Sequence, residues 1–485
     1  MNLELPSKIN HKIFHGINFY AEGGRACYFY THYFVLLQAA RQHKFWNHKF
    51  YFAAPMKNHI VKWYFAWPNN DFLRYSRRFA KQPSLLGKIE KYINVTREAG
   101  VNNLKNINLP KASNIKLHKL FFSYFESYWK LMITAGLMRA TDKGVMFDLR
   151  TELKNRANAE ELLNIAAVPK KLSFALLEEI SLLNLAIKIK NNDFSITSKQ
   201  CDGFLNNIEK EFAWGVMGYY HEKPRNKNDY ALLLKNILNQ DPAKHLLEIK
   251  KRVAFEQKSR NGLVRFLNQD GKNLIKVASM APYIKDLYKF SINKLEYFAE
   301  PLFTELSSRT GYSVEFIKDF HPTEILAVAL NNHKKISAAK VEERVKQSLI
   351  LAVPNKYAIY LGEEAQKFED NYLAPKQNNT NEFKGRVACL GLAKGKVKVV
   401  LGPADFDKLK KGDILVVANT SPDFVPILRR AAAIVAEDGG ITAHVSLVSR
   451  EFGIPCVVGI PHITAMLKDG DLVEVDANKG IVRKI

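Results

Sequence analysis

The sequence predicts a multidomain protein, in which a largely α-helical N-terminal body, with room for minor β structure, precedes a small α/β domain. Three observations predict this fold class. The 485 residues exceed what one compact core ordinarily holds, so we expect two or three domains. Apolar residues recur at helical spacing through most of the body. Beyond the body, short β-rich runs alternate with short helical stretches.

The body contains two segments of different pattern. Residues 1–115 are rich in aromatic residues at mixed spacing, where strand and helix patterns are hard to separate. Residues 116–370 carry apolar residues at i, i+3, i+4 and i+7, which predicts amphipathic helices. Ser313 and Pro322 predict the starts of two of these helices.

The C-terminal part begins with a change of composition. Residues 371–385 are polar and Asn-rich, which predicts a linker. Residues 386–485 then contain six β-rich runs, which predict an independent α/β domain of ordinary size. These runs are KVKVVLG, DILVVAN, AAIVAED, PCVVGI, DLVEVDA and GIVRKI.

Composition excludes several classes of protein. Apolar residues make up 47% and charged residues 25%, as in ordinary globular proteins. No apolar run is long enough to span a bilayer, and MNLELPSKINHK lacks the layout of a secretory signal. The four cysteines are scattered without metal-ligand spacing, as in a reducing compartment. We therefore expect a cytoplasmic protein with no membrane contact and no metal site.

The net charge of +24 lies mostly in the body. Counting Lys and Arg against Asp and Glu leaves +20 before Lys384 and +4 from Lys384 onward. Such a surface attracts nucleic acid, an anionic substrate or an acidic partner, or it is simply a solvated basic surface. The basic residues are dispersed, with no long Lys/Arg run and no RNA-binding motif. We therefore do not expect nucleic acid among the partners.

The stretch 437–453, EDGGITAHVSLVSREFG, has the pattern of a strand end, a turn and a helix. Gly439 and Gly440 permit positive φ and close approach of a ligand, and Thr442 can cap the helix. His444 then lies in the first turn, where unpaired N–H groups and the helix dipole favour an anion. A neutral imidazole there is a competent nucleophile toward a phosphoryl group. The alternative is a histidine that merely occupies a helix start.

Three stretches resemble the phosphohistidine swivelling (mobile) domain of PEP-utilising enzymes, which include PEP synthase, pyruvate phosphate dikinase and the rifampicin phosphotransferases. They are GLAKGKVKVV at 391–400, FDKLKKGDILVVANTSPDFVPILRRAAAIVAEDGG at 406–440 and ITAHVSLVSREFGIPCVVG at 441–459. The resemblance implies that His444 is the phosphorylated catalytic residue. It also implies that Thr442 lies beside the phosphate and the Gly439–Gly440 turn beneath it.

Two further residues bear on this site. The family usually has Ser or Cys where Ala443 stands, so a hydroxyl or thiol contact is missing while the nucleophile is kept. Arg450 is the nearest arginine in sequence after the histidine and is the candidate to support the phosphate charge. Its alternative interpretation is a surface arginine on the exposed side of the helix.

Residues 205–375 are similar to the helical segment that precedes the mobile domain in rifampicin phosphotransferases. Within it, WGVMGYYHEKPR resembles a Gly-rich loop of that segment and makes Glu222 and Arg225 candidate substrate-binding residues. The His and Arg that follow the first Gly in the family are replaced here by Val216 and Met217. Ordinary surface residues are the alternative for both candidates.

The sequence shows no ATP-grasp pattern and no PEP-binding barrel after the mobile domain. We therefore expect ATP and Mg²⁺ on a separate ATP-grasp protein, and no cofactor or metal on this chain. The predicted function is a phosphotransferase component that carries a phosphoryl group on His444 from this ATP-binding partner to an unidentified small-molecule acceptor, for which the helical residues 116–370 are the candidate binding domain. The alternative is a non-catalytic binding or scaffold protein that keeps the swivelling-domain fold.

Overall fold

The computed structural model describes most of the chain and divides it into two compact units. The described residues are 20–26, 51–58, 60–66, 73–156, 159–217, 223–331, 336–353, 356–373, 381–418, 420, 424–437, 444–460 and 462–485. The sheet unit comprises Met1–Asp71, Ser113–His118 and Phe303–Ile485, and the helical unit comprises Phe72–Ala112 and Lys119–Leu302.

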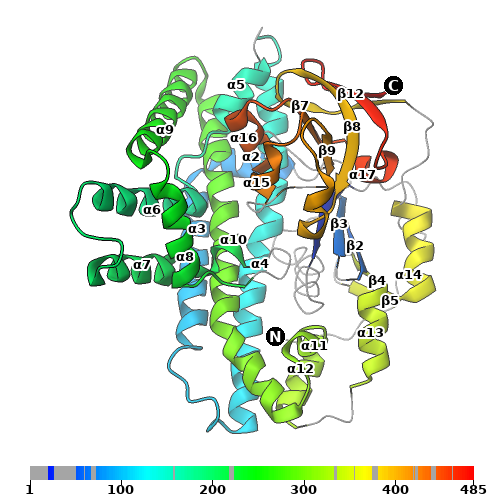
Figure 1. Cartoon of the computed structure of the whole chain (residues 1–485). Helices are drawn as coiled ribbons and strands as arrows, with labels where there is room; N and C mark the ends of the chain where they lie inside the picture. Colours follow the sequence, from blue (N-terminus) through cyan, green and yellow to red (C-terminus); the bar gives the residue numbers. More distant parts are fainter. Residues whose placement is uncertain are drawn as a thin grey trace. The chain divides into compact units, whose positions relative to one another are not determined.

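The helical unit is built from helices of very different length (Figure 1). Its elements, of which α4 and α10 extend into the sheet unit, are α2 (Leu73–Lys81), α3 (Ser84–Asn102), α4 (Asn114–Leu153), α5 (Ala159–Ala166), α6 (Phe174–Lys190), α7 (Lys199–Phe212), η3 (Ala213–Val216), α8 (Lys227–Leu238), α9 (Pro242–Arg265) and α10 (Gln269–Thr310). Side-chain caps satisfy free N–H groups at several of these starts, for example Ser173 at α6 and Asn226 at α8.

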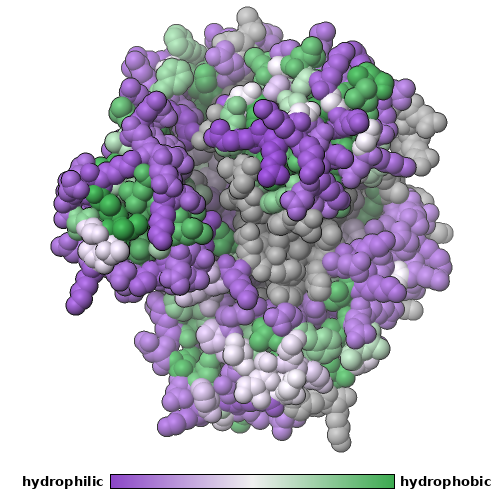
Figure 2. Space-filling model, viewed as in Figure 1, coloured by the Kyte–Doolittle hydropathy of each residue, from purple (hydrophilic) through white to green (hydrophobic). Residues whose placement is uncertain are grey.

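The long helices α4 and α10 pack closely with α3. A Cβ atom at Gly100 of α3 would lie 2.9 Å from side-chain atoms of both Leu295 and Ser127, so only glycine fits this close approach. The hydroxyl of Tyr128 donates to Glu296 Oε1 at 3.0 Å. Figure 2 shows hydrophobic residues gathered over α6 to α8 within a hydrophilic rim.

The first sheet of the sheet unit is antiparallel throughout. It has the order β1-β3-β2-β4-β5, with β1 (Tyr20–Ala26), β2 (Tyr51–Lys57), β3 (Ile60–Ala66), β4 (Ser348–Val353) and β5 (Lys356–Leu361). The sequence pattern did not predict β4 and β5. A short apolar run such as SLILAV cannot be told from a buried helix by periodicity, and its partner β2 lies far away along the chain.

The second sheet lies in the C-terminal α/β domain. Its order is β6-β13-β12-β8-β9-β10-β11-β7, and the run from β8 to β11 is parallel while the other pairings are antiparallel. The strands are β6 (Glu382–Lys384), β7 (Arg386–Cys389), β8 (Leu392–Val400), β9 (Ile414–Val417), β10 (Ala433–Ala436), β11 (Cys456–Val458), β12 (Leu472–Asp476) and β13 (Ile481–Lys484).

The helices of the sheet unit that follow α10 are short. They are α11 (Val314–Lys318), α12 (Pro322–Ala329), α13 (Ala338–Lys346), α14 (Gly362–Phe368), η5 (Glu369–Leu373), η6 (Pro403–Lys408), α15 (Val425–Leu428), α16 (His444–Phe452) and α17 (Ile463–Met466). Ser313 caps α11 and Pro322 begins α12, as the sequence predicted.

The predicted fold class is confirmed: a largely helical body with some β structure precedes a small α/β domain. All six predicted β-rich runs form strands. The last residues of the expected linker 371–385 form β6, which pairs with β13. The other domain boundaries stay predictions. Within the described residues, no helix is long and apolar enough to cross a membrane.

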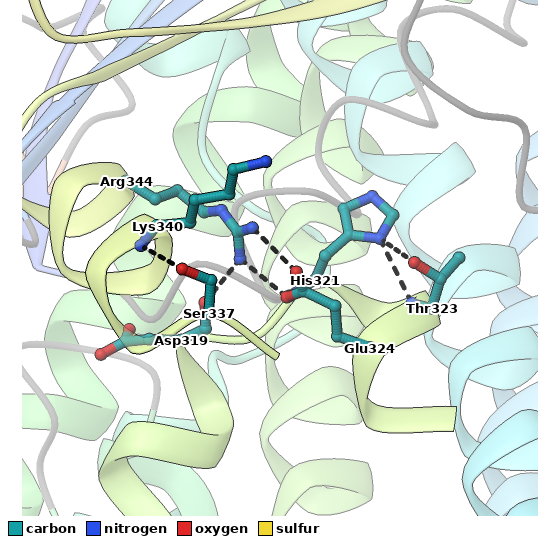
Figure 3. Close-up of polar contacts among 7 residues, drawn as sticks. All are labelled: Asp319, His321, Thr323, Glu324, Ser337, Lys340 and Arg344. Atoms are coloured by element: carbon teal, nitrogen blue, oxygen red, sulfur yellow. Dashed lines mark hydrogen bonds and ion pairs between the residues drawn. The ribbon is translucent and has the colours of Figure 1, made fainter. Parts of the chain in front are cut away.

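A buried polar cluster joins α11, α12 and α13 (Figure 3). Arg344 donates to both carboxylate oxygens of Glu324 at 2.9 and 3.1 Å and to the carbonyl oxygen of Asp319 at 3.2 Å. Glu324 also accepts the backbone N–H of His321 at 2.7 Å, and His321 Nδ1 accepts the backbone N–H of Thr323 at 3.2 Å. Burial, with help from the charge of Arg344, lowers the pKa of His321 to about 3.

This cluster generates a pH prediction. Between about pH 6.5 and 3 the unfolded chain protonates His321 while the folded protein does not, so the free energy of unfolding falls as pH falls, by up to about 1.4 kcal/mol per pH unit. His321→Asn keeps a good N-cap residue and removes this titration. Denaturant unfolding between pH 7 and 4 should show a shallower pH dependence in the variant. Equal slopes would contradict a neutral, buried His321.

Candidate functional site

The parallel strands β9, β10 and β11 of the α/β domain end at one edge of the sheet. In sheets of this kind ligands bind outside the carboxyl ends of the strands. Glu437 follows β10 directly, its N–H donates to the carbonyl oxygen of Val417 at 3.0 Å, and α16 starts at His444. The N-terminus of α16 therefore follows the carboxyl end of β10 after a short connection, as a phosphate-binding strand–turn–helix requires.

Helix α16 is fixed by its buried face and by its C-terminus. Val445 and Val448 are buried, and Ser446 and Ser449 are wholly buried, so the inward face is apolar or small. Gly453, with φ 65°, ends the helix, and the N–H of Ile454 donates to the carbonyl oxygen of Ser449 at 2.9 Å. This geometry satisfies carbonyl groups at the helix end with a left-handed glycine.

The structure describes only some of the predicted site residues. His444 is the first residue of α16, which confirms the predicted helix start. Gly439, Gly440, Thr442 and Glu222 lie outside the described residues. Their predicted roles, like that of His444 as a nucleophile, stay predictions. Within the described part of the chain, no group of three or more His, Cys, Asp or Glu side chains could hold a metal ion.

Arg450 lies in the last turn of α16, six residues after His444, which corresponds to about 9 Å along a helix axis. Its Nε donates to the carbonyl oxygen of Ser446 at 2.9 Å. Its charge also acts on the thiols of Cys389 and Cys456, which are paired across β7 and β11. Burial nevertheless raises the pKa of Cys456 to about 12. Support of a phosphate by Arg450 stays a prediction.

Sequence analysis missed Glu437 and Thr464 at this edge. Glu437 is only 5% exposed, and its Oε1 accepts the backbone N–H of Thr464 at 2.9 Å and the hydroxyl of the same residue. These bonds attach the start of α17 to the end of β10. An acidic residue directly after a buried strand was the available sequence feature, but its partner lies 27 residues later.

Arg225, the other described candidate, belongs to the helical unit. Its Nη1 donates to Glu178 Oε2 at 2.7 Å, and the Tyr230 hydroxyl donates to Glu178 Oε1 at 2.7 Å. Burial opposes the charge on Arg225, but Glu178 outweighs it and the pKa of Arg225 rises. Burial and Glu178 together raise the pKa of Tyr230. Arg225 therefore has a structural partner that the sequence did not predict, and its substrate-binding role stays a prediction.

This arrangement predicts a measurable coupling. Arg225→Met, Glu178→Gln and the double variant form a double-mutant cycle, in which we expect a coupling of about 1–2 kcal/mol in the free energy of unfolding. The figure is modest because 29% of the Arg225 side chain is exposed to solvent. Denaturant unfolding of the four proteins measures it. A coupling near zero would mean that Arg225 is not held by Glu178.

Comparison with known proteins identifies the C-terminal segment. Residues 409–480 match the family described as PEP-utilising enzyme, mobile domain. The segment contains β9, β10, α16, β11, α17 and β12.

Curated relatives match only part of the chain. The phosphoenolpyruvate synthase of Pyrococcus furiosus is 50% identical over 102 residues, 21% of this chain and 12% of that protein. The probable phosphoenolpyruvate synthase of Archaeoglobus fulgidus is 52% identical over 100 residues, 21% of this chain and 13% of that protein. The phosphoenolpyruvate synthase of Aeropyrum pernix is 34% identical over 203 residues, 41% of this chain and 21% of that protein. The chain thus spans about a fifth or less of these relatives, and its similarity to the PEP-utilising enzymes includes the mobile-domain match over residues 409–480.

Proposed function

We propose that the chain is a phosphotransferase component that carries a phosphoryl group on His444. ATP and Mg²⁺ would be held by a separate ATP-grasp protein in the cytoplasm, and the group would pass to a small-molecule acceptor. The observation that supports this most is that α16 begins at His444, eight positions after the end of the parallel strand β10 and inside the segment that matches the mobile domain. The names of the relatives support an acceptor of the size of a small metabolite.

The proposed transfer has two balanced steps. A ring nitrogen of His444 forms a bond to phosphorus while the bond from phosphorus to the departing nucleotide oxygen breaks. An acceptor hydroxyl then forms a new P–O bond, the P–N bond breaks, and the hydroxyl proton passes to solvent. The imidazole returns to its neutral form. Dividing one transfer into two lets separate sites share one nucleophile.

A position at the start of a helix suits the covalent intermediate, and His444 is the first residue of α16. The first N–H groups of a helix have no partner within it, and the helix dipole favours negative charge at this end. We propose that Thr442 and the Gly439–Gly440 turn contact the phosphate and that Arg450 contributes charge. Glu222 and Arg225 are the proposed acceptor-binding residues, and residues 371–385 are the proposed hinge for delivery.

The transfer is tested by incubating the chain with ATP, Mg²⁺ and a co-purifying or genomically neighbouring ATP-grasp protein. We expect an acid-labile phosphate on the chain, because phosphohistidine hydrolyses in acid. His444→Ala should abolish the label. His245→Ala, which removes a partly exposed histidine of the helical unit, is the matched control and should keep it. Mass spectrometry of the labelled peptide identifies the site.

A second arm does not depend on the partner. Phosphoramidate, a small chemical phosphoryl donor, should label His444 in the isolated chain and leave His444→Ala unlabelled. Absence of label with phosphoramidate and with every ATP-grasp candidate would overturn the proposal. The non-catalytic scaffold, which the absence of a hydroxyl or thiol group at Ala443 favours, would then be the better interpretation.

A further inference from the structure

The carboxyl edge of the mobile domain is in contact with the five-stranded sheet of the same unit. Tyr64 of β3 stacks on His462, which directly precedes α17, with 6.1 Å between ring centroids and 25° between ring planes. Tyr64 is 6% exposed, whereas His462 is only partly buried. Tyr64 of the five-stranded sheet therefore contacts the His462 ring beside the carboxyl edge of the second sheet.

The backbone at His462 forms a tight turn. His462 has φ 60° and ψ 17°, the left-handed region that few residues other than glycine adopt. The nearby Gly459 also has positive φ, at 75°. The carbonyl oxygen of His462 accepts N–H groups of Ala465 at 2.9 Å and Met466 at 3.1 Å. The sharp turn from β11 into α17 is thus fixed at the residue that meets Tyr64.

The Tyr64 hydroxyl is electrostatically coupled to the same edge. Burial raises the pKa of Tyr64, and the charge of Glu437 raises it further, followed by that of Glu369. Glu437 is the buried carboxylate that holds Thr464. Tyr64 therefore interacts with two groups at this edge: it stacks on His462, and the charge of Glu437 acts on its hydroxyl group.

We propose that Tyr64 and His462 form a docking contact, through which the five-stranded sheet holds the carboxyl edge of the mobile domain. Its role in delivering a phosphoryl group rests on the proposed function, but the contact itself does not. A mobile domain needs a docking contact that biases its position and still breaks. One loosely stacked aromatic pair supplies a bias of about 2- to 10-fold. This small bias is sufficient because both partners belong to one chain, which gives each a high effective concentration at the other.

The contact is tested by the reactivity of His462 toward diethyl pyrocarbonate, which modifies accessible imidazoles. Tyr64→Leu fills the sheet core with an apolar side chain and removes the ring. We expect His462 to react about 2- to 10-fold faster in this variant, as measured by peptide mass spectrometry. Tyr64→Phe keeps the ring and should react like the unchanged protein.

Two controls separate docking from general loosening of the sheet. Tyr360→Leu removes a ring that packs against the same core from β5 and should leave His462 unchanged. The rate at His245 of the helical unit should be equal in all variants. An unchanged His462 rate in Tyr64→Leu, or an equal increase in Tyr360→Leu, overturns the proposal.

A reciprocal measurement applies even if Tyr64→Leu does not fold. His462→Asn keeps a residue that tolerates the left-handed conformation and removes the ring. Amide hydrogen exchange in residues 60–66 should then accelerate about 2- to 10-fold, and unchanged exchange overturns the docking contact. Neither experiment contains a phosphoryl donor. Failure of docking is therefore distinguishable from failure of His444 to accept phosphate.

Discussion

The parallel order of β8, β9, β10 and β11 is the constraint on which the candidate site depends. Parallel strands bring their carboxyl ends to one edge, and here the chain passes from β10 to α16 after that edge. Strands β9, β10 and β11 are short and fully buried. The sheet core therefore fixes the edge at which these strands end, and His444 is the first residue of the helix that follows β10 in sequence.

A buried carboxyl group lies close in sequence to the start of α16. Glu437 is only 5% exposed, and it directly follows β10. A buried carboxylate is costly unless it accepts hydrogen bonds, and Thr464 supplies two of them. Glu437 thus serves to attach α17 to β10.

The sheet unit is assembled across a long excursion of the chain. Strand β2 pairs with β4, although the helical unit occupies most of the sequence between them. Pairings of this kind form slowly, because the chain loses the entropy of loop closure before the contacts between the strands stabilise it. The cluster of His321, Glu324 and Arg344 lies just before β4 and supports the returning chain with a partly buried ion pair. Arg344 also donates to the carbonyl oxygen of Asp319, and Glu324 accepts the backbone N–H of His321, so these hydrogen bonds offset part of the desolvation cost of the pair.

The sequence by itself determined the features that local chemistry controls. The apolar runs of the α/β domain, the caps of α11 and α12 and the start of α16 all depend on residues within a few positions of one another. The mobile-domain stretches were identified in the same way, because their motif is contiguous.

Only the tertiary structure decided the partnerships between distant residues. Glu178 for Arg225, Thr464 for Glu437, β2 for β4 and Tyr64 for His462 could not be predicted. The two members of each pair are separated by between 27 and almost 400 residues along the chain. Many other polar or aromatic side chains could have filled the same role. Local propensity does not select among these possible partners. Packing of the whole fold does select among them, because it brings only certain parts of the backbone close together.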